Sequence, residues 1–176
     1  MVVIFDIETL GLDAFRDQIV LIGMKVEGKI KQWKSWREKN ELSMISKCLK
    51  TMKTIPYFET VVGYNVMKFD VPFIATRLSV YGKWSHDLWE LLYRNRKWLD
   101  LYQFLGNDFR KMSSWLSKLG IKAKYEQITG KDIPGFYREK KYRKIIQHNK
   151  DDLETSEQLY LKLQEEFPDL LGLRKL

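Results

Sequence analysis

A short apolar run that ends in two acids constrains this chain more than any other segment. The run from Val2 to Phe5 has the composition of a buried strand, and Asp6 and Glu8 follow it with one apolar residue between them. Residues two apart in a strand point to the same side of the sheet, so we expect both carboxylates on one face. Burying such a pair costs several kcal/mol unless something offsets the charge. The pair therefore indicates either a site for a hard cation, which prefers carboxylate oxygen, or a strand end whose acids face water.

Size and composition favour a single folded domain. The 176 residues, of which 44% are hydrophobic and 14% aromatic, are enough to bury one core, and we expect one domain over residues 1–176. The single Cys48 excludes an internal disulfide and a multi-cysteine zinc site. No apolar run approaches the roughly 20 residues that cross a bilayer, and the N-terminal run leads into acids, unlike a signal peptide. We therefore expect a cytoplasmic protein without membrane contact.

The charge balance indicates what kind of molecule the protein binds. The chain has 31 Lys and Arg against 23 Asp and Glu, which gives a net charge of +8. Such an excess favours a polyanion, and nucleic acid is the common one, although charge alone does not identify it.

Residue patterns along the chain predict strands first and then alternating helices and strands. A tight Glu27-Gly28 turn joins the second and third strands. Pro72 near its start and Gly82 just past its end mark one helix clearly. This order predicts an α/β fold, with a mixed sheet made of an antiparallel hairpin of strands one to three plus parallel strands, flanked by helices. We expect strands at residues 2–6, 18–26, 29–36, 60–64 and 98–104, and helices at residues 41–52, 71–81, 113–119 and 137–166.

A further acid stands at a strand-to-helix junction. The strand at 60–64 runs into Asn65, and Asp70 comes just before the helix that has Pro72 in its first turn. Asp70 could cap this helix. It could equally be one of the ligands that sheet-based active sites gather at such junctions. The residues alone leave both interpretations open.

The last candidate acids lie on the predicted C-terminal helix. Asp152 shares a helical face with His148 and Leu159, which becomes apolar and should point inward. Asp151 lies on a different face, with Thr155, which should be solvated. We therefore expect Asp152 to be a ligand and Asp151 a surface charge. His148, one turn before Asp152, could take a proton from water, or it could be a structural residue at the helix edge.

Three segments together resemble a known family. FDIET, GYN followed by FD, and His148 four residues before Asp152 are similar to the three motifs of the DEDD superfamily of 3′–5′ exonucleases, which has a ribonuclease H-like fold. The middle motif most resembles the proofreading domain of family B DNA polymerases, and the ending, HNKDD, resembles stand-alone YprB-like exonucleases. The resemblance implies that two divalent metal ions, Mg²⁺ or Mn²⁺, bind to Asp6, Glu8, Asp70 and Asp152.

The resemblance also implies further roles. His148 would deprotonate the attacking water, although it stands at the spacing where one branch of the superfamily has Tyr, four residues before the last Asp rather than five. Thr9 and Leu10 would touch the terminal nucleotide, and Asn65 would support the middle motif.

A basic run with interleaved tyrosines precedes His148. This mixture suits phosphate contacts and base stacking, and a solvated helix face has the same composition. The substrate-binding residues that we expect from this run are Arg138, Lys141, Tyr142 and Lys144.

These observations predict a two-metal-dependent 3′–5′ exonuclease. It would hydrolyse single-stranded DNA from the 3′ end and release nucleoside 5′-monophosphates, with RNA as another possible substrate. Two alternatives stay open. One is a catalytically idle module that binds nucleic acid or a polymerase, which would be expected to lack one or more of the four acids. The other is a structure-specific endonuclease.

Overall fold

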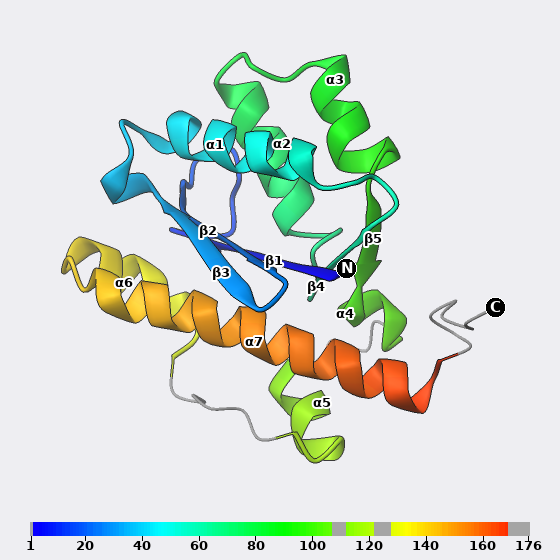
Figure 1. Ribbon diagram of the computed structural model, residues 1–176. Coiled ribbons are helices and arrows are strands. Elements are labelled where there is room, and N and C mark those ends of the chain that lie inside the picture. Colours follow the sequence, from blue (N-terminus) through cyan, green and yellow to red (C-terminus); the bar gives the residue numbers. More distant parts are fainter. Residues whose placement is uncertain (1, 107–111, 122–127, 169–176) are drawn as a thin grey trace.

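The computed structural model describes residues 2–106, 112–121 and 128–168. It contains a five-stranded sheet with the order β3-β2-β1-β4-β5 (Figure 1). β1 lies at the centre and pairs antiparallel with β2 and parallel with β4. The predicted mixed sheet is confirmed. The strands are β1 (Val2–Thr9), β2 (Ile19–Val26), β3 (Lys29–Lys34), β4 (Thr60–Gly63) and β5 (Lys97–Asp100).

Helices cover both faces of the sheet (Figure 1). One face carries α1 (Glu41–Thr54), α2 (Asp70–Val80) and α3 (His86–Trp89). The other carries α5 (Met112–Lys118) and α7 (Tyr142–Glu166), with α6 (Ile133–Arg138) beside the start of α7. Short elements complete the chain: the 3-10 turns Ser35–Arg37 and Gly130–Asp132, the π-helical turn Glu90–Arg94 and α4 (Leu101–Phe104). Within the described ranges, no helix is long and apolar enough to cross a membrane.

Side chains of β1 alternate between two hydrophobic cores. Phe5 packs into the core beneath α1 and α2, whereas Ile4 packs with Leu153 and Leu159 of α7. Both faces of β1 are thus buried, which explains its nearly continuous apolar sequence. Because the side chains of a strand alternate, Asp6 and Glu8 lie on the same face as Ile4, toward α7.

The predicted hairpin between β2 and β3 is confirmed. Glu27 and Gly28 both have positive φ angles, 48° and 75°, as a two-residue turn between twisted strands requires. β3 ends at Lys34 rather than at Trp36, because the chain turns there into the 3-10 turn Ser35–Arg37. At the same end of the sheet, β1 continues past Asp6 to Thr9.

Two further predicted elements are wrong in their extent by a larger margin, and the helical residues 86–94 were not predicted. The expected strand 98–104 stops at Asp100, whose carboxylate accepts a hydrogen bond from the backbone N–H of Tyr102 and caps α4. The expected helix 137–166 is two helices. α6 ends at Arg138, Lys140 takes a left-handed φ of 56°, and α7 begins at Tyr142. The break turns the chain so that α6 packs back against α7.

Candidate active site

The first two acids enter the site from the end of β1. Glu8 is 4% exposed, and its Oε1 has no hydrogen-bond partner among the described residues. Oδ2 of Asp6 accepts a hydrogen bond of 2.7 Å from Nδ2 of Asn149. A buried carboxylate oxygen without a partner is costly. The strand end thus holds one acid that is fixed by a neighbour and one that has coordination capacity to spare.

Asp70 joins this pair from α2. Its Oδ1 accepts a hydrogen bond of 3.0 Å from the backbone N–H of Ile7, which lies between the first two acids. The helix cap is Phe69, and no side chain caps α2 by a hydrogen bond. The cap interpretation of Asp70 is therefore wrong, because its carboxylate turns toward β1.

The turn before α2 is held by a residue of β5. Asn65 has a left-handed φ of 63°, and its backbone N–H donates to Oδ1 of Asp100 at 2.9 Å. The backbone N–H of Met67 donates to Oδ2 of the same carboxylate, also at 2.9 Å. A buried carboxylate thus fixes the turn that leads to Asp70, and Asn65 lies at the pocket wall.

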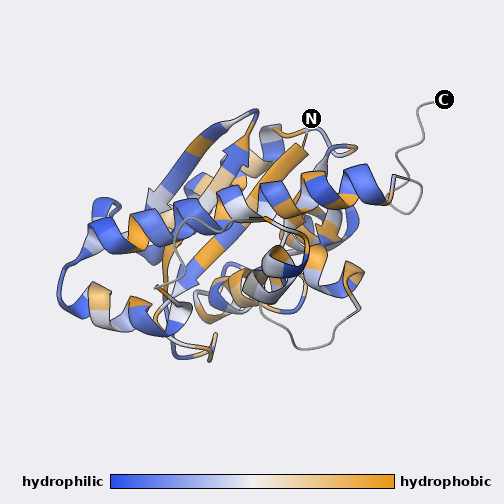
Figure 2. Cartoon of the chain, turned by 90° about the horizontal axis from the view of Figure 1, so that it is seen from below, coloured by the Kyte–Doolittle hydropathy of each residue, from blue (hydrophilic) through white to orange (hydrophobic). Residues whose placement is uncertain are grey.

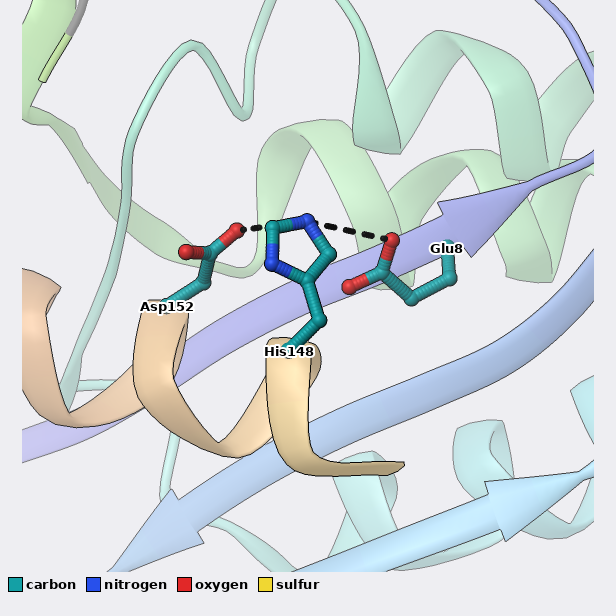
Figure 3. Close-up of side chains that lie close together, drawn as sticks. All are labelled: Glu8, His148 and Asp152. Atoms are coloured by element: carbon teal, nitrogen blue, oxygen red, sulfur yellow. Dashed lines mark ion pairs between the residues drawn. The ribbon is translucent and has the colours of Figure 1, made fainter. Parts of the chain in front are cut away.

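The side chains from α7 complete the group (Figure 3). The ring of His148 lies between two carboxylates, with its Nε2 3.6 Å from Oδ2 of Asp152 and 3.9 Å from Oε2 of Glu8. Ligand atoms of these three residues lie within 4.8 Å of one another. Acids and histidine that are widely separated in sequence therefore meet where β1 faces α7.

All five predicted catalytic residues line one pocket of about 560 Å³: Asp6, Glu8, Asp70, His148 and Asp152. Residues of α5 and of the segment 128–131 also line this pocket.

Asp151 does not lie where we predicted. We expected a solvated side chain, but Asp151 is 7% exposed and accepts a hydrogen bond of 2.8 Å from Nε2 of Gln147. It lines the pocket beside Asp152, because α5 and residues 128–131 close over this side of α7. The Asp152 side chain is the more exposed of the two, at 32%. Only Asp152 lies within reach of both His148 and Glu8.

Burial raises the pKa of all four candidate acids. It is the largest cause for each of them, and repulsion from the neighbouring carboxylates raises the pKa of Asp6 and Glu8 further. The pKa of Asp70 rises to about 8, although the N–H of Ile7 opposes the shift. The pKa of Asp152 is also raised, while His148 opposes the shift. Four acids that resist ionisation together would ionise readily beside a divalent cation.

The donor set fits such a cation. Hard divalent ions prefer oxygen ligands, and the pocket offers carboxylate oxygens from three separate elements, including the unpartnered Oε1 of Glu8. Asp6, Glu8, Asp70 and Asp152 could hold Mg²⁺ or Mn²⁺ here, with His148 between Glu8 and Asp152.

The predicted substrate residues at the end of β1 do not line this pocket. The hydroxyl of Thr9 donates to the carbonyl oxygen of Gly11 at 2.6 Å. Leu10 packs against a small core with Val20 and Ile133. Both side chains therefore have structural contacts of their own.

The basic run before His148 is also outside the carboxylate pocket. Arg138 is exposed at the end of α6, and Lys141 forms an ion pair with Glu139. The Lys144 ammonium lies 4.8 Å from the ring centroid of Phe136. Tyr142 stacks on Trp36, and a separate groove contains Lys141, Tyr142 and Lys144.

Sequence reasoning missed two residues that support the site. Asn149 is completely buried; it donates to Asp6 and accepts from Nε2 of Gln32 at 2.9 Å. A Cβ on Gly23 would lie 2.1 Å from Oδ1 of Asn149, so this glycine makes room for the amide. Asp100 is the second. The helical position of Asn149, on the inward side of α7 next to His148, was a usable signal for it.

Two solved structures of known proteins are similar to this chain. It resembles the family B DNA polymerase from the hyperthermophilic archaeon Pyrobaculum calidifontis, with a TM-score of 0.73 and 19% identity over 94% of this chain and 24% of the polymerase. It also resembles exonuclease I, with a TM-score of 0.65 and 11% identity over 97% of this chain and 42% of that chain. The chain thus spans about a quarter of the polymerase and less than half of exonuclease I. No curated protein matches its sequence.

The family comparison covers nearly all of the chain. The model of the ribonuclease H superfamily matches residues 3–164, from β1 to the last turn of α7. The match includes all four candidate acids and His148, and it agrees with the central β1 and the mixed sheet. The resemblance inferred from the sequence is confirmed at this level: the chain belongs to the ribonuclease H superfamily.

Proposed function

We propose that this protein is a metal-dependent 3′–5′ exonuclease that removes nucleotides from the 3′ end of single-stranded DNA, with RNA as the alternative substrate. The observation that carries the proposal is the meeting of Asp6, Glu8, Asp70 and Asp152 in one open pocket beside His148. The ribonuclease H fold, which is shared with a DNA polymerase and with exonuclease I, supports a nuclease.

The four acids would hold two divalent ions, Mg²⁺ or Mn²⁺. Two such ions bind the scissile phosphate, lower the pKa of water and stabilise the leaving oxygen. The need for a cation follows from the charges, since four carboxylates with raised pKa values are poorly stable together without one.

His148 would take the proton from the attacking water. Its ring reaches into the pocket, and Nε2 lies 3.6 Å from Asp152 and 3.9 Å from Glu8. These two carboxylates would orient the ring and stabilise its protonated form. Hydrolysis would release nucleoside 5′-monophosphates.

Two alternative functions would give different results with nucleic-acid substrates. A binding module without activity would bind single strands and leave them intact. A structure-specific endonuclease would cut internally and would prefer branched or hybrid substrates. The retention of all four acids in one pocket favours an active enzyme over the idle module.

The test uses 5′-labelled single-stranded DNA and RNA oligonucleotides with Mg²⁺, Mn²⁺ or EDTA. We expect a ladder that shortens from the 3′ end only with metal, and no ladder with Asp6→Ala. Binding without cleavage would refute the proposal, and products of internal cutting would replace it with an endonuclease.

A further inference from the structure

A second groove lies at the opposite side of the first turns of α7 from the carboxylate pocket. It has a volume of about 630 Å³ and is formed by the end of β3, the 3-10 turn Ser35–Arg37, the connection between α6 and α7, and the start of α7. Figure 2 shows this end of α7 and the turn before it as largely hydrophilic. Its lining includes the cations Lys34, Arg37 and Arg143 and the aromatic residues Trp36 and Tyr142.

The groove is strongly basic. Six of its nine lining residues are Lys or Arg, and none is acidic. Burial and the nearby Arg37 lower the pKa of Lys34, so like charges are crowded here. In the described part of the chain, Arg37 and Arg143 have no carboxylate partner, whereas Lys141 is paired with Glu139. An anion in the groove would relieve this repulsion.

An aromatic stack fixes the geometry of the groove. Trp36 and Tyr142 lie face to face, with centroids 4.4 Å apart and planes 8° apart, and Tyr137 meets both rings edge-on. The hydroxyls of Ser35 and Tyr137 are 3.3 Å apart, within hydrogen-bond distance. This packing ties the turn after β3 to the start of α7. The aromatic part of the groove is therefore built by tertiary contacts, and the exposed side chains of Arg37 and Arg143 lie around it.

The groove and the carboxylate pocket share one helix. Arg143 precedes Asp152 by nine residues, or two and a half turns, so the two residues are about 14 Å apart along the axis of α7 and lie on opposite faces of the helix. This axial distance alone corresponds to about four phosphates at the 3.4 Å spacing along one strand of a duplex, and the path around α7 adds to it. The N-terminal end of α7 also carries partial positive charge and has no acid in its first turn.

We propose that this groove binds the sugar-phosphate backbone of single-stranded nucleic acid a few nucleotides upstream of the 3′ end that occupies the carboxylate pocket. The inference rests on the proposed function for the direction of the strand. Phosphates contact Arg37, Arg143 and Lys34, and the aromatic stack forms the floor beneath them. A substrate that is too short to reach the groove gains no binding affinity from it.

The test compares Arg37→Gln/Arg143→Gln with Lys29→Gln/Lys83→Gln. The control pair removes the same charge from exposed positions outside the groove. Binding of a fluorescent 20-nucleotide single strand is measured by anisotropy in EDTA at 50 and 200 mM salt, and melting temperatures verify folding. A loss of two phosphate contacts makes the negative slope of log affinity against log salt shallower by about 1.4. The groove variant should therefore lose about sevenfold more affinity at 50 mM than at 200 mM salt.

Hydrolysis by the metal-loaded protein separates the groove from the active site. The groove variant should lower kcat/KM for a 20-nucleotide strand and leave that for a trinucleotide unchanged. Equal binding losses in both variants, or no loss in the groove variant, would overturn the inference. Tighter binding of polyglutamate than of the oligonucleotide would also overturn it. If the wild type cleaves nothing, the proposed function fails, and the binding measured in EDTA still decides whether the groove holds nucleic acid.

Discussion

Replacing Asp70 with Asn removes a charge from the candidate site and keeps the hydrogen bond that positions the side chain. The amide oxygen of Asn can still accept the hydrogen bond from Ile7 N–H, which Oδ1 of Asp70 accepts at 3.0 Å. The substitution removes one negative charge from the group of four acids. In metal-free protein at pH 8.5, we therefore expect Asp70→Asn to be more stable than the wild type.

The pKa of Asp70 gives the size and the sign of this effect. Burial is the main reason why its pKa rises to about 8 in the folded protein, whereas an unfolded Asp has a pKa of about 3.9. A raised pKa disfavours folding once the unfolded chain ionises, so stability is highest below about pH 4 and falls as the pH rises through about 8. Four units at about 1.4 kcal/mol each set an upper limit of about 5.5 kcal/mol. Because one proton also relieves the neighbouring carboxylates, we expect a gain of about 1–3 kcal/mol.

Urea unfolding in EDTA at pH 4 and pH 8.5 measures the effect, with Asp87→Asn as a control at an exposed position. The gain should be near zero at pH 4 and largest at pH 8.5. With metal the order should reverse, because a cation at 1,000 times its dissociation constant adds about 4.1 kcal/mol to the wild type, which exceeds the gain expected from the substitution. If Asp70→Asn is less stable than the wild type at pH 8.5 without metal, the buried charge of Asp70 is not the cost that a cation offsets.

Three other predictions concern the same pocket. Asp152→Asn should abolish metal-dependent hydrolysis of single strands. Asp151→Asn should change the hydrolysis rate little, because an amide oxygen can still accept the hydrogen bond from Gln147. The opposite outcome would exchange the roles of Asp151 and Asp152. His148→Ala should lower kcat by about 10²- to 10⁴-fold at saturating metal with unchanged binding of single strands in EDTA, and an unchanged kcat would exclude it as the base. Gly23→Ala should cost about 1–3 kcal/mol in urea unfolding and lower activity, since its Cβ would lie 2.1 Å from Oδ1 of Asn149; a variant with normal stability and activity would show that the amide can move freely.

Local sequence was informative wherever one element decides the outcome. The alternation of a strand places Asp6 and Glu8 on one face, and the period of a helix places His148 beside Asp152. The two-residue turn at Glu27 has so few solutions that the hairpin could be predicted directly. These predictions use backbone geometry that is the same in any fold.

Predictions that depended on what covers a surface were less successful. The side of α7 that carries Asp151 is polar and was expected to face water, but α5 and residues 128–131 close over it. The interpretation of Asp70 as a cap or a ligand could not be decided from its position in the chain. A contact with Ile7, 63 residues away, decides it.

The sequence by itself determined the acids, the order of the five strands and of the longer helices, and the side of each element on which the acids lie, because these follow from chemistry and from short-range periodicity. Only the tertiary structure decided which faces are buried, how Asn149 holds Asp6, and that a basic groove with Arg37 stands apart from the carboxylates. Such features arise from contacts between elements that are distant in sequence, and no local pattern encodes them.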